Sequence, residues 1–277
     1  MTPSKPVRTA FYVSGSTAIT AETLGRSMLT QFSEYNFRQV TLPYLQNPAQ
    51  IEAAVLRIKL AAEEDGSRPI VFSTLTDPLL LKELRRSEAL VLDLFDAFLV
   101  PLEREIGQPP TLKSGQSHAV RDLNSYRIRA DAVHFAMQND DGARTTYYDQ
   151  ADLIVIGVSR SGKTPTCLYM AMQYGLYMAN YPLTEEDFDD LRLPKSLLPH
   201  QHKLFALTIG ADRLEEIRQQ RRGGSRYASR QQCDMEVRAF GALISRFQIP
   251  SLEVTEYSIE EISSRILAKT GLRRRLF

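Results

Sequence analysis

The chain has few of the residues that build disulfide-stabilised or metal-stabilised folds. Of its 277 residues, two are cysteines, Cys167 and Cys233, and four are histidines. Two cysteines cannot make the disulfide framework of a small secreted domain, and no Cys and His lie at zinc-site spacing. These absences exclude disulfide scaffolds and zinc modules, and they favour a protein of the reducing cytoplasm.

The chain also lacks an excess of either charge and any long apolar run. Its 34 Lys and Arg residues balance 33 Asp and Glu residues, which excludes the overall basic footprint of a nucleic-acid-binding protein. No apolar run approaches the roughly 20 residues that span a bilayer. The N-terminal "MTPSKPVRT" has no hydrophobic signal core. We therefore expect no nucleic-acid partner, no membrane contact and a cytoplasmic location.

What the chain does have is an alternation of strand and helix patterns. Apolar runs predict strands at 8–15, 37–45 and 68–75, and helix patterns lie between them at 21–32 and 47–65. Residues suited to cap helix N-termini are Thr20, Asn47, Asp77, Asp212 and Ser258. Such alternation predicts an α/β fold with a parallel sheet covered on both faces.

A second α/β run starts at "ADLIVIG", and its strands are expected at 152–156, 176–181, 203–209 and 251–255. Residues 107–118, "GQPPTLKSGQSH", have the composition of a linker or exposed loop. We predict an N-terminal α/β domain at 1–145, suited to recognising a protein substrate, and a second α/β domain at 146–277. The helix expected at 121–138 could pack on either half.

The second domain opens with a complete phosphate-binding motif, G-x-x-x-x-G-K-[ST]. Its residues are Gly157, Val158, Ser159, Arg160, Ser161, Gly162, Lys163 and Thr164. The glycines let backbone N–H groups point at phosphate oxygens, Lys163 reaches the terminal phosphates, and Thr164 offers a hydroxyl to Mg²⁺. The motif lies between an apolar strand and a helix pattern, as it must. The alternative is a glycine-rich turn with a solvated lysine.

The surroundings of this motif narrow the class of nucleotide-binding protein. The next strand, "KLFALTIGADR", does not end directly in the Asp that holds Mg²⁺ in motors and GTPases. A guanine-reading Asn-Lys-x-Asp is also absent. With about 130 residues available, a small kinase-like P-loop domain fits best.

Two clusters of charge could complete such a site. Arg218 belongs to an arginine-rich stretch at 213–230, and one of its members could neutralise a moving phosphoryl group. The alternative is a solvated basic helix face. Asp140 and Asp141 precede Gly142, which indicates a turn. Either carboxylate could instead act as a base or a Mg²⁺ ligand. We take Lys163, Asp141 and Arg218 as catalytic candidates.

The order of motifs resembles one family closely. The shared segments are "STAITAE", "NDDG", "LIVIGVSRSGKTPT", "ANYPL", "QHKLFALTI", "DRLEEIRQQRR", "SRYAS" and "YSIEEIS". Together, from about residue 8 to the C-terminus, they resemble the regulatory proteins of phosphoenolpyruvate synthase and pyruvate, phosphate dikinase. The loop sequence "SGSTAIT" at 14–20 departs from the family pattern, because family members carry an Asp where this chain has Gly15. We expect Gly15 in place of this Asp to affect the activity only mildly, since the rest of the family pattern is intact.

The resemblance implies a bifunctional enzyme. One activity phosphorylates a Thr of phosphoenolpyruvate synthase with ADP as the donor, which releases AMP and switches the synthase off. The other removes that phosphate with inorganic phosphate and releases pyrophosphate. Residues 157–164 would bind ADP in one direction and phosphate or pyrophosphate in the other, and a homodimer is also implied. The alternatives are an ATP-dependent small-molecule P-loop kinase and a binding module without turnover.

Overall fold

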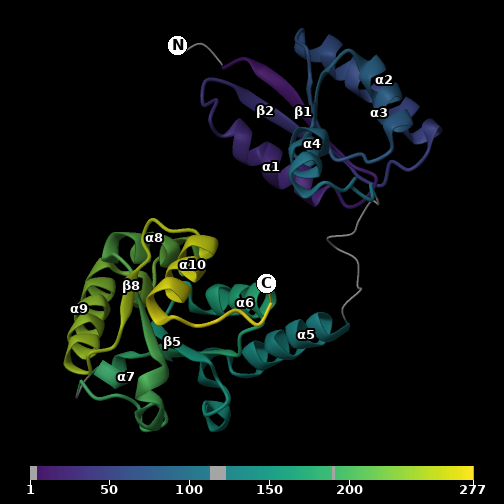
Figure 1. Cartoon of the computed structure of the whole chain (residues 1–277). Helices are drawn as coiled ribbons and strands as arrows, with labels where there is room; N and C mark the ends of the chain where they lie inside the picture. Colours follow the sequence, from purple (N-terminus) through teal and green to yellow (C-terminus); the bar gives the residue numbers. More distant parts are fainter. Residues whose placement is uncertain (1–4, 113–122, 189–190, 277) are drawn as a thin grey trace. The chain divides into compact units, whose positions relative to one another are not determined.

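The computed structural model describes residues 5–112, 123–188 and 191–276. The chain divides into two compact units, Met1–Ala119 and Val120–Phe277. Each unit is built on a four-stranded sheet with helices on both faces (Figure 1). Every strand pair is parallel. The predicted fold class, two successive α/β parallel-sheet domains, is confirmed.

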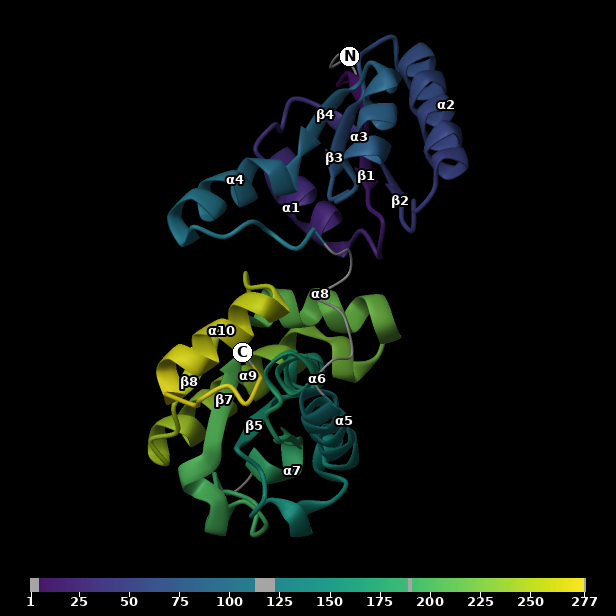
Figure 2. The ribbon, with the colours of Figure 1, turned by 45° about the vertical axis from the view of Figure 1, so that its right-hand side comes forward.

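The N-terminal unit has the strand order β2-β1-β3-β4. Its strands are β1 (Val7–Val13), β2 (Asn36–Leu42), β3 (Ile70–Ser73) and β4 (Leu90–Asp93), and its helices are α1 (Ile19–Leu29), α2 (Pro48–Asp65), α3 (Pro78–Leu84), the 3₁₀ helix η1 (Arg85–Ser87) and α4 (Leu94–Ile106). Helices α2 and α3 cover one face of the sheet, and α1 and α4 cover the other (Figures 1 and 2).

Alternation along β1 divides the apolar core of this unit between the two faces. Phe11 and Val13 belong to the cluster under α2 and α3, whereas Ala10 and Tyr12 belong to the cluster under α1. Successive side chains of a strand point to opposite faces of the sheet. A strand covered on both faces therefore has to be apolar at successive positions, which is why residues 10–13 of β1, Ala-Phe-Tyr-Val, form a continuous apolar run.

Two of the three helix N-caps predicted in the N-terminal unit are confirmed. The side chain of Asn47 accepts a hydrogen bond from the Gln50 N–H, and Asp77 accepts from the N–H groups of Leu79 and Leu80. Thr20 was the wrong cap for α1. This helix begins at Ile19, after Ala18 in the left-handed conformation, and has no side-chain cap.

The C-terminal unit has the strand order β6-β5-β7-β8. Its strands are β5 (Leu153–Val158), β6 (Met178–Leu183), β7 (Leu204–Thr208) and β8 (Ser251–Glu253). Its α-helices are α5 (Leu123–Gln138), α6 (Lys163–Tyr174), α7 (Glu185–Phe188), α8 (Ala211–Arg222), α9 (Arg230–Arg246) and α10 (Ile259–Thr270). Short 3₁₀ turns are η3 (Asp140–Gly142), η4 (Thr145–Tyr147), η5 (Leu198–Lys203) and η6 (Arg226–Ala228). Helices α5, α6 and α10 lie on one side of the sheet, and α8 and α9 on the other (Figure 2).

The division between the units falls earlier than the sequence indicated. Helix α5 packs on α6 and β6, and its Ala132, Phe135 and Ala136 join the core of the C-terminal unit. The predicted boundary at residue 145 therefore moves to residue 119, because this amphipathic helix buries its apolar face on the second sheet. Of the expected linker, Gly107 ends α4 in a left-handed conformation, and residues 113–118 lie outside the described ranges.

The remaining caps were predicted with mixed success. Ser258 and Glu261 form the expected reciprocal capping box at α10. Asp212 does not cap α8, which begins one residue earlier after Gly210, and Asp212 lies in its first turn. Within the described ranges, no helix has both the length and the apolar character required to cross a bilayer.

We predict that Gly25→Ala destabilises the N-terminal unit although Ala favours helix formation. A Cβ at Gly25 would lie 2.5 Å from the ring of Tyr12 and 2.8 Å from that of Phe72. Such overpacking costs about 1–3 kcal/mol, which exceeds the gain of about 1 kcal/mol in helix propensity. Gly241 in α9 has open space around it, so Gly241→Ala is the control and should be neutral or stabilising. Urea unfolding curves measure both, and an equal gain for the two variants would contradict the packing argument.

Candidate functional site

The phosphate-binding motif lies at the carboxyl end of the central strand of the C-terminal sheet. All six residues of β5 are buried, and β6 and β7 flank this strand. The chain leaves β5 at Val158, passes through residues 159–162 and enters α6 at Lys163. The edge of a parallel sheet where the strands end is the usual place for a ligand in α/β folds.

Gly157 and Gly162 suit the backbone of this motif for two different reasons. Gly162 has φ of 86° and Arg160 has φ of 76°, both in the left-handed region. A Cβ on Gly157 would lie 2.6 Å from Ser161 Oγ and 2.8 Å from the carbonyl oxygen of Leu207. Because a backbone atom cannot move aside cheaply, only glycine fits at position 157. Glycine is thus needed at position 157 for lack of space and favoured at position 162 by the left-handed backbone.

Lys163 and Ser161 place polar groups inside the loop. Lys163 is 5% exposed, and its Nζ donates a hydrogen bond of 3.0 Å to the carbonyl oxygen of Val158. Burial lowers the pKa of Lys163 from 10.5 to about 8, and the charges of Asp141 and Asp140 oppose this shift. Ser161 Oγ is buried without a hydrogen-bond partner among the described residues. A buried ammonium and an unpartnered hydroxyl are groups that a phosphate would satisfy.

The acidic turn η3 is fixed beside this loop by Asn180 of β6. The side chain of Asn180 donates a hydrogen bond of 2.5 Å to Asp140 Oδ1 and accepts one of 3.1 Å from the Asp141 N–H. The backbone N–H of Asn180 donates to the carbonyl oxygen of Asn139. One fully buried asparagine therefore holds the turn at three points.

Asp140 also reaches the last residue of the motif. Thr164 Oγ1 donates a hydrogen bond of 2.7 Å to Asp140 Oδ1. A carboxylate therefore reaches the end of the motif from a turn that precedes β5 in the chain. Among the described residues, no group of three or more His, Cys, Asp or Glu side chains gathers as a metal site. Mg²⁺ suits such a sparse set, because it commonly keeps waters and takes one or two carboxylates plus phosphate oxygens.

Asp141 differs from its neighbour in environment. Its backbone is left-handed, with φ of 48°, and its side chain is exposed. No hydrogen bond to its carboxylate occurs in the described part of the chain, while its charge acts on Lys163. Asp140 is already engaged by Thr164 and Asn180, so the two neighbouring carboxylates differ in their hydrogen bonds.

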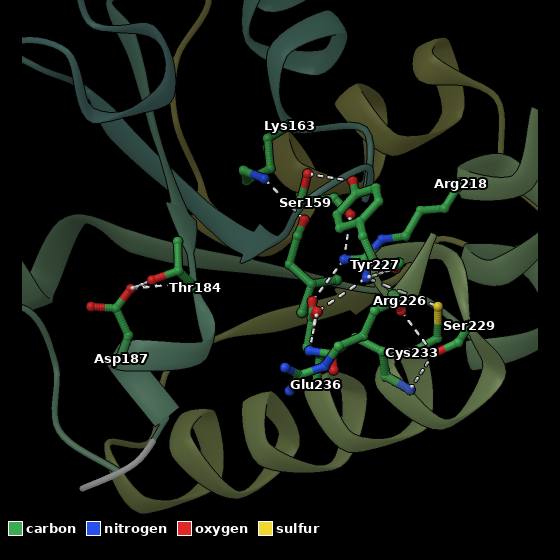
Figure 3. A network of polar contacts seen from close by, with 12 residues as sticks. Ser159, Lys163, Thr184, Asp187, Arg218, Arg226, Tyr227, Ser229, Cys233 and Glu236 are labelled. Carbon is green, nitrogen blue, oxygen red and sulfur yellow. Dashed lines mark hydrogen bonds and ion pairs between the residues drawn. The ribbon is translucent and has the colours of Figure 1, made fainter. Parts of the chain in front are cut away.

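The structure places Arg218, one of the three catalytic candidates, in contact with other protein groups. It is 0% exposed, and its guanidinium pairs with both carboxylate oxygens of Glu236 at 2.7 and 3.1 Å. It also donates to the carbonyl oxygens of Ser159 and Tyr227 at 3.1 and 3.0 Å. Both terminal nitrogens of Arg218 are therefore engaged, and the guanidinium stabilises the phosphate loop through the Ser159 carbonyl oxygen (Figure 3).

Tyr227 and Glu236 complete this support. The hydroxyls of Tyr227 and Ser159 share a hydrogen bond of 2.8 Å, and the Arg218 guanidinium lies 4.1 Å from the centre of the Tyr227 ring. Sequence reasoning missed Tyr227, Glu236 and Asn180 as site residues. The available signal for Tyr227 and Asn180 was their place in the shared segments "SRYAS" and "ANYPL".

Fold and site together define an α/β protein with the strand–loop–helix form of phosphate-binding proteins, supplemented by two acidic residues beside the loop. The comparisons with known proteins agree. Residues 10–267 match the family described as kinase/pyrophosphorylase. The chain therefore belongs to the kinase/pyrophosphorylase family.

Relatives cover nearly the whole chain. A protein of Alcanivorax borkumensis is 63% identical over 269 residues, which are 97% of this chain and 99% of the relative. A protein of Pseudomonas fluorescens is 50% identical over 97% of this chain and 98% of the relative. Each carries the name "Putative phosphoenolpyruvate synthase regulatory protein". Both the family and these names support a phosphotransferase role.

We predict that Glu236→Gln strongly destabilises the C-terminal unit. The substitution leaves the Arg218 charge buried without a counter-charge, which costs about 3–5 kcal/mol. Glu216→Gln is the control, because it removes the partner of Arg213 in an exposed ion pair worth about 1 kcal/mol or less. The free energy of unfolding in urea measures both. Equal small effects would show that the buried pair is not needed to hold the loop.

Proposed function

We propose that this protein is an ADP-dependent protein threonine kinase and a phosphate-dependent pyrophosphorylase acting on phosphoenolpyruvate synthase. The observation that carries the proposal is the placement of Asp141 and Asp140 beside one complete phosphate loop, Asp141 near Lys163 and Asp140 on Thr164. The names of the relatives support the synthase as the target, and the family description supports the pair of activities.

The donor binds through its diphosphate. Backbone N–H groups of residues 157–164 and the N-terminus of α6 face the phosphates, and Lys163 pairs with the terminal one. Thr164 and Asp140 would hold Mg²⁺, which supplies positive charge to the phosphate oxygens when bound. Glycine at 157 and the unpartnered Ser161 hydroxyl fit a phosphate in the same loop.

In the forward direction, the substrate Thr hydroxyl attacks the β-phosphorus of ADP. Asp141 accepts the hydroxyl proton as the new O–P bond forms. The bond between the β-phosphorus and the bridging oxygen breaks, and AMP leaves with that oxygen. Lys163 neutralises the negative charge on the moving phosphoryl group.

In the second reaction, inorganic phosphate occupies the loop in place of the donor. One of its oxygens attacks the phosphorus of phosphothreonine, and the bond from phosphorus to the Thr oxygen breaks. The Thr oxygen takes a proton from the protonated carboxyl of Asp141, and pyrophosphate leaves. One loop serves both reactions, because phosphoryl transfer depends mainly on positioning and charge stabilisation.

The N-terminal unit has the role of recognising the synthase in this proposal. It is a compact unit with its own core. It is a complete four-stranded α/β sheet, larger than the lid that a small-molecule kinase needs to close over its substrate.

The test is incubation of phosphoenolpyruvate synthase with β-labelled ADP and this protein. We expect label on a synthase Thr together with AMP. Asp141→Asn keeps the size and left-handed tolerance of the residue but removes the base, and it should lower kcat about 10²- to 10⁴-fold. Lys163→Ala should abolish both reactions.

An unlabelled synthase, with the synthase itself active, would overturn the proposal. ADP formation from ATP and a metabolite would instead establish a small-molecule kinase. A near-normal rate for Asp141→Asn would assign the turn a structural role alone.

We predict that ADP binding weakens above about pH 8. ADP binds the protonated Lys163, and the ADP-free protein loses this proton as the pH rises through its pKa of about 8. Binding must then recover the proton, so the Kd for ADP should rise by up to about tenfold per pH unit above this value. Calorimetry between pH 7 and 9.5 measures the slope. In Lys163→Arg the side chain stays charged over this pH range, so the Kd for ADP should change little with pH. A Kd of the wild-type protein that does not change with pH would contradict the prediction.

A further inference from the structure

A cavity of about 550 Å³ lies beside the phosphate loop, and Ser159 of the loop belongs to its lining. The lining residues that bear on its use are Asp141, Ser159, Thr184, Glu185, Arg226 and Tyr227. They come from the acidic turn, the loop itself, the end of β6, α7 and η6. Figure 3 shows Ser159, Tyr227 and Arg226 in the polar network, with Thr184 at the neighbouring strand end.

The cavity lies next to the place where the terminal phosphate of a bound donor would lie. In a loop of this motif the lysine reaches the terminal phosphates, so the transferable phosphate lies near Lys163. Asp141, whose charge acts on Lys163, also lines the cavity, and so does Ser159. A group placed in this cavity would therefore face both the transferable phosphate and the proposed base.

We propose that this cavity is the acceptor subsite, which takes the threonine side chain of the protein substrate in one reaction and its phosphothreonine in the other. Arg226 recognises the phosphoryl group of the phosphothreonine. This inference rests on the proposed function and deepens it, because it names the surface and the residue that distinguish the phosphorylated substrate from the unphosphorylated one.

Arg226 is suited to exchange partners. Its guanidinium pairs with Glu185 Oε1 at 2.7 Å, and the side chains are 78% and 48% exposed. Exposed ion pairs contribute little to stability, whereas a phosphate dianion offers an arginine stronger, charge-assisted hydrogen bonds. Phosphothreonine can therefore displace Glu185, and Glu185 screens the arginine while the site is empty of phosphate.

The contacts of Tyr227, another lining residue, favour a peptide over a nucleoside. Tyr227 is fixed through its hydrogen bond with Ser159, and Arg218 covers one face of its ring at 4.1 Å. That face is closed to a stacking base. Two further lining residues, Thr184 directly after β6 and Glu185 at the start of α7, are exposed, so they leave the cavity open to a chain that continues beyond the threonine.

The experiment measures both reactions of the full-length protein with intact synthase, together with ADP binding by calorimetry. Arg226→Ala should raise the KM for phosphorylated synthase about tenfold or more. It should change the KM for unphosphorylated synthase and the Kd for ADP less than about threefold, because neither carries the threonine phosphate. Arg226→Lys should restore part of the loss, and Glu185→Gln should lower the KM for phosphorylated synthase.

Two matched controls separate this role from general charge effects. Arg213→Ala removes an exposed arginine from another ion pair, with Glu216, and Glu186→Gln removes the charge next to Glu185. Both should behave as wild type. Equal KM changes for the two forms of the synthase would overturn the subsite, and a loss of ADP affinity in Arg226→Ala would assign the cavity to the nucleoside instead. Wild-type protein that transfers no label overturns the proposed function as well, so the two failures are distinguishable.

Discussion

The site depends on one buried ion pair, between Arg218 of α8 and Glu236 of α9. Arg218 also donates to the carbonyl oxygens of Ser159 and Tyr227, so a single guanidinium joins two helices, a 3₁₀ turn and the phosphate loop. An arginine suits this place because its planar fork makes several hydrogen bonds in fixed directions. Removing either charge would leave the other buried and unpaired. The contact of Arg218 with the Ser159 carbonyl oxygen therefore stabilises the loop conformation without a bound phosphate.

A second fixed contact decides how the two acidic residues divide their roles. Asn180 holds the acidic turn against β6 and orients Asp140 toward Thr164. Asp141 is thereby left in a left-handed conformation with an exposed carboxylate, next to the cavity that also receives Arg226. Asp141, Ser159 of the phosphate loop and Arg226 thus line one cavity, which is the arrangement on which the proposed transfer to a protein side chain rests.

Much of the fold and part of the site could be predicted from sequence. The apolar runs, the Asn47 and Asp77 caps and the Ser258–Glu261 box are local signals, and they gave the parallel α/β architecture. The Thr20 and Asp212 caps failed, because α1 and α8 begin at Ile19 and Ala211, and their N-cap residues, Ala18 and Gly210, make no side-chain cap. The boundary at 145 failed because α5 has an apolar face that either sheet could cover, and packing chose the second.

The sequence by itself determined the phosphate loop, because its glycines, Lys163 and Thr164 lie within eight residues and their geometry is local. It also determined the family, because the shared segments run through nearly the whole chain. Tertiary structure alone decided that Arg218 lies behind the loop while Arg226 lines the cavity. It also paired Asp140 with Thr164, which is 24 residues away. The physical reason is that an arginine or an aspartate has the same local signature whether it faces solvent, a partner charge or a ligand, and long-range packing makes that choice.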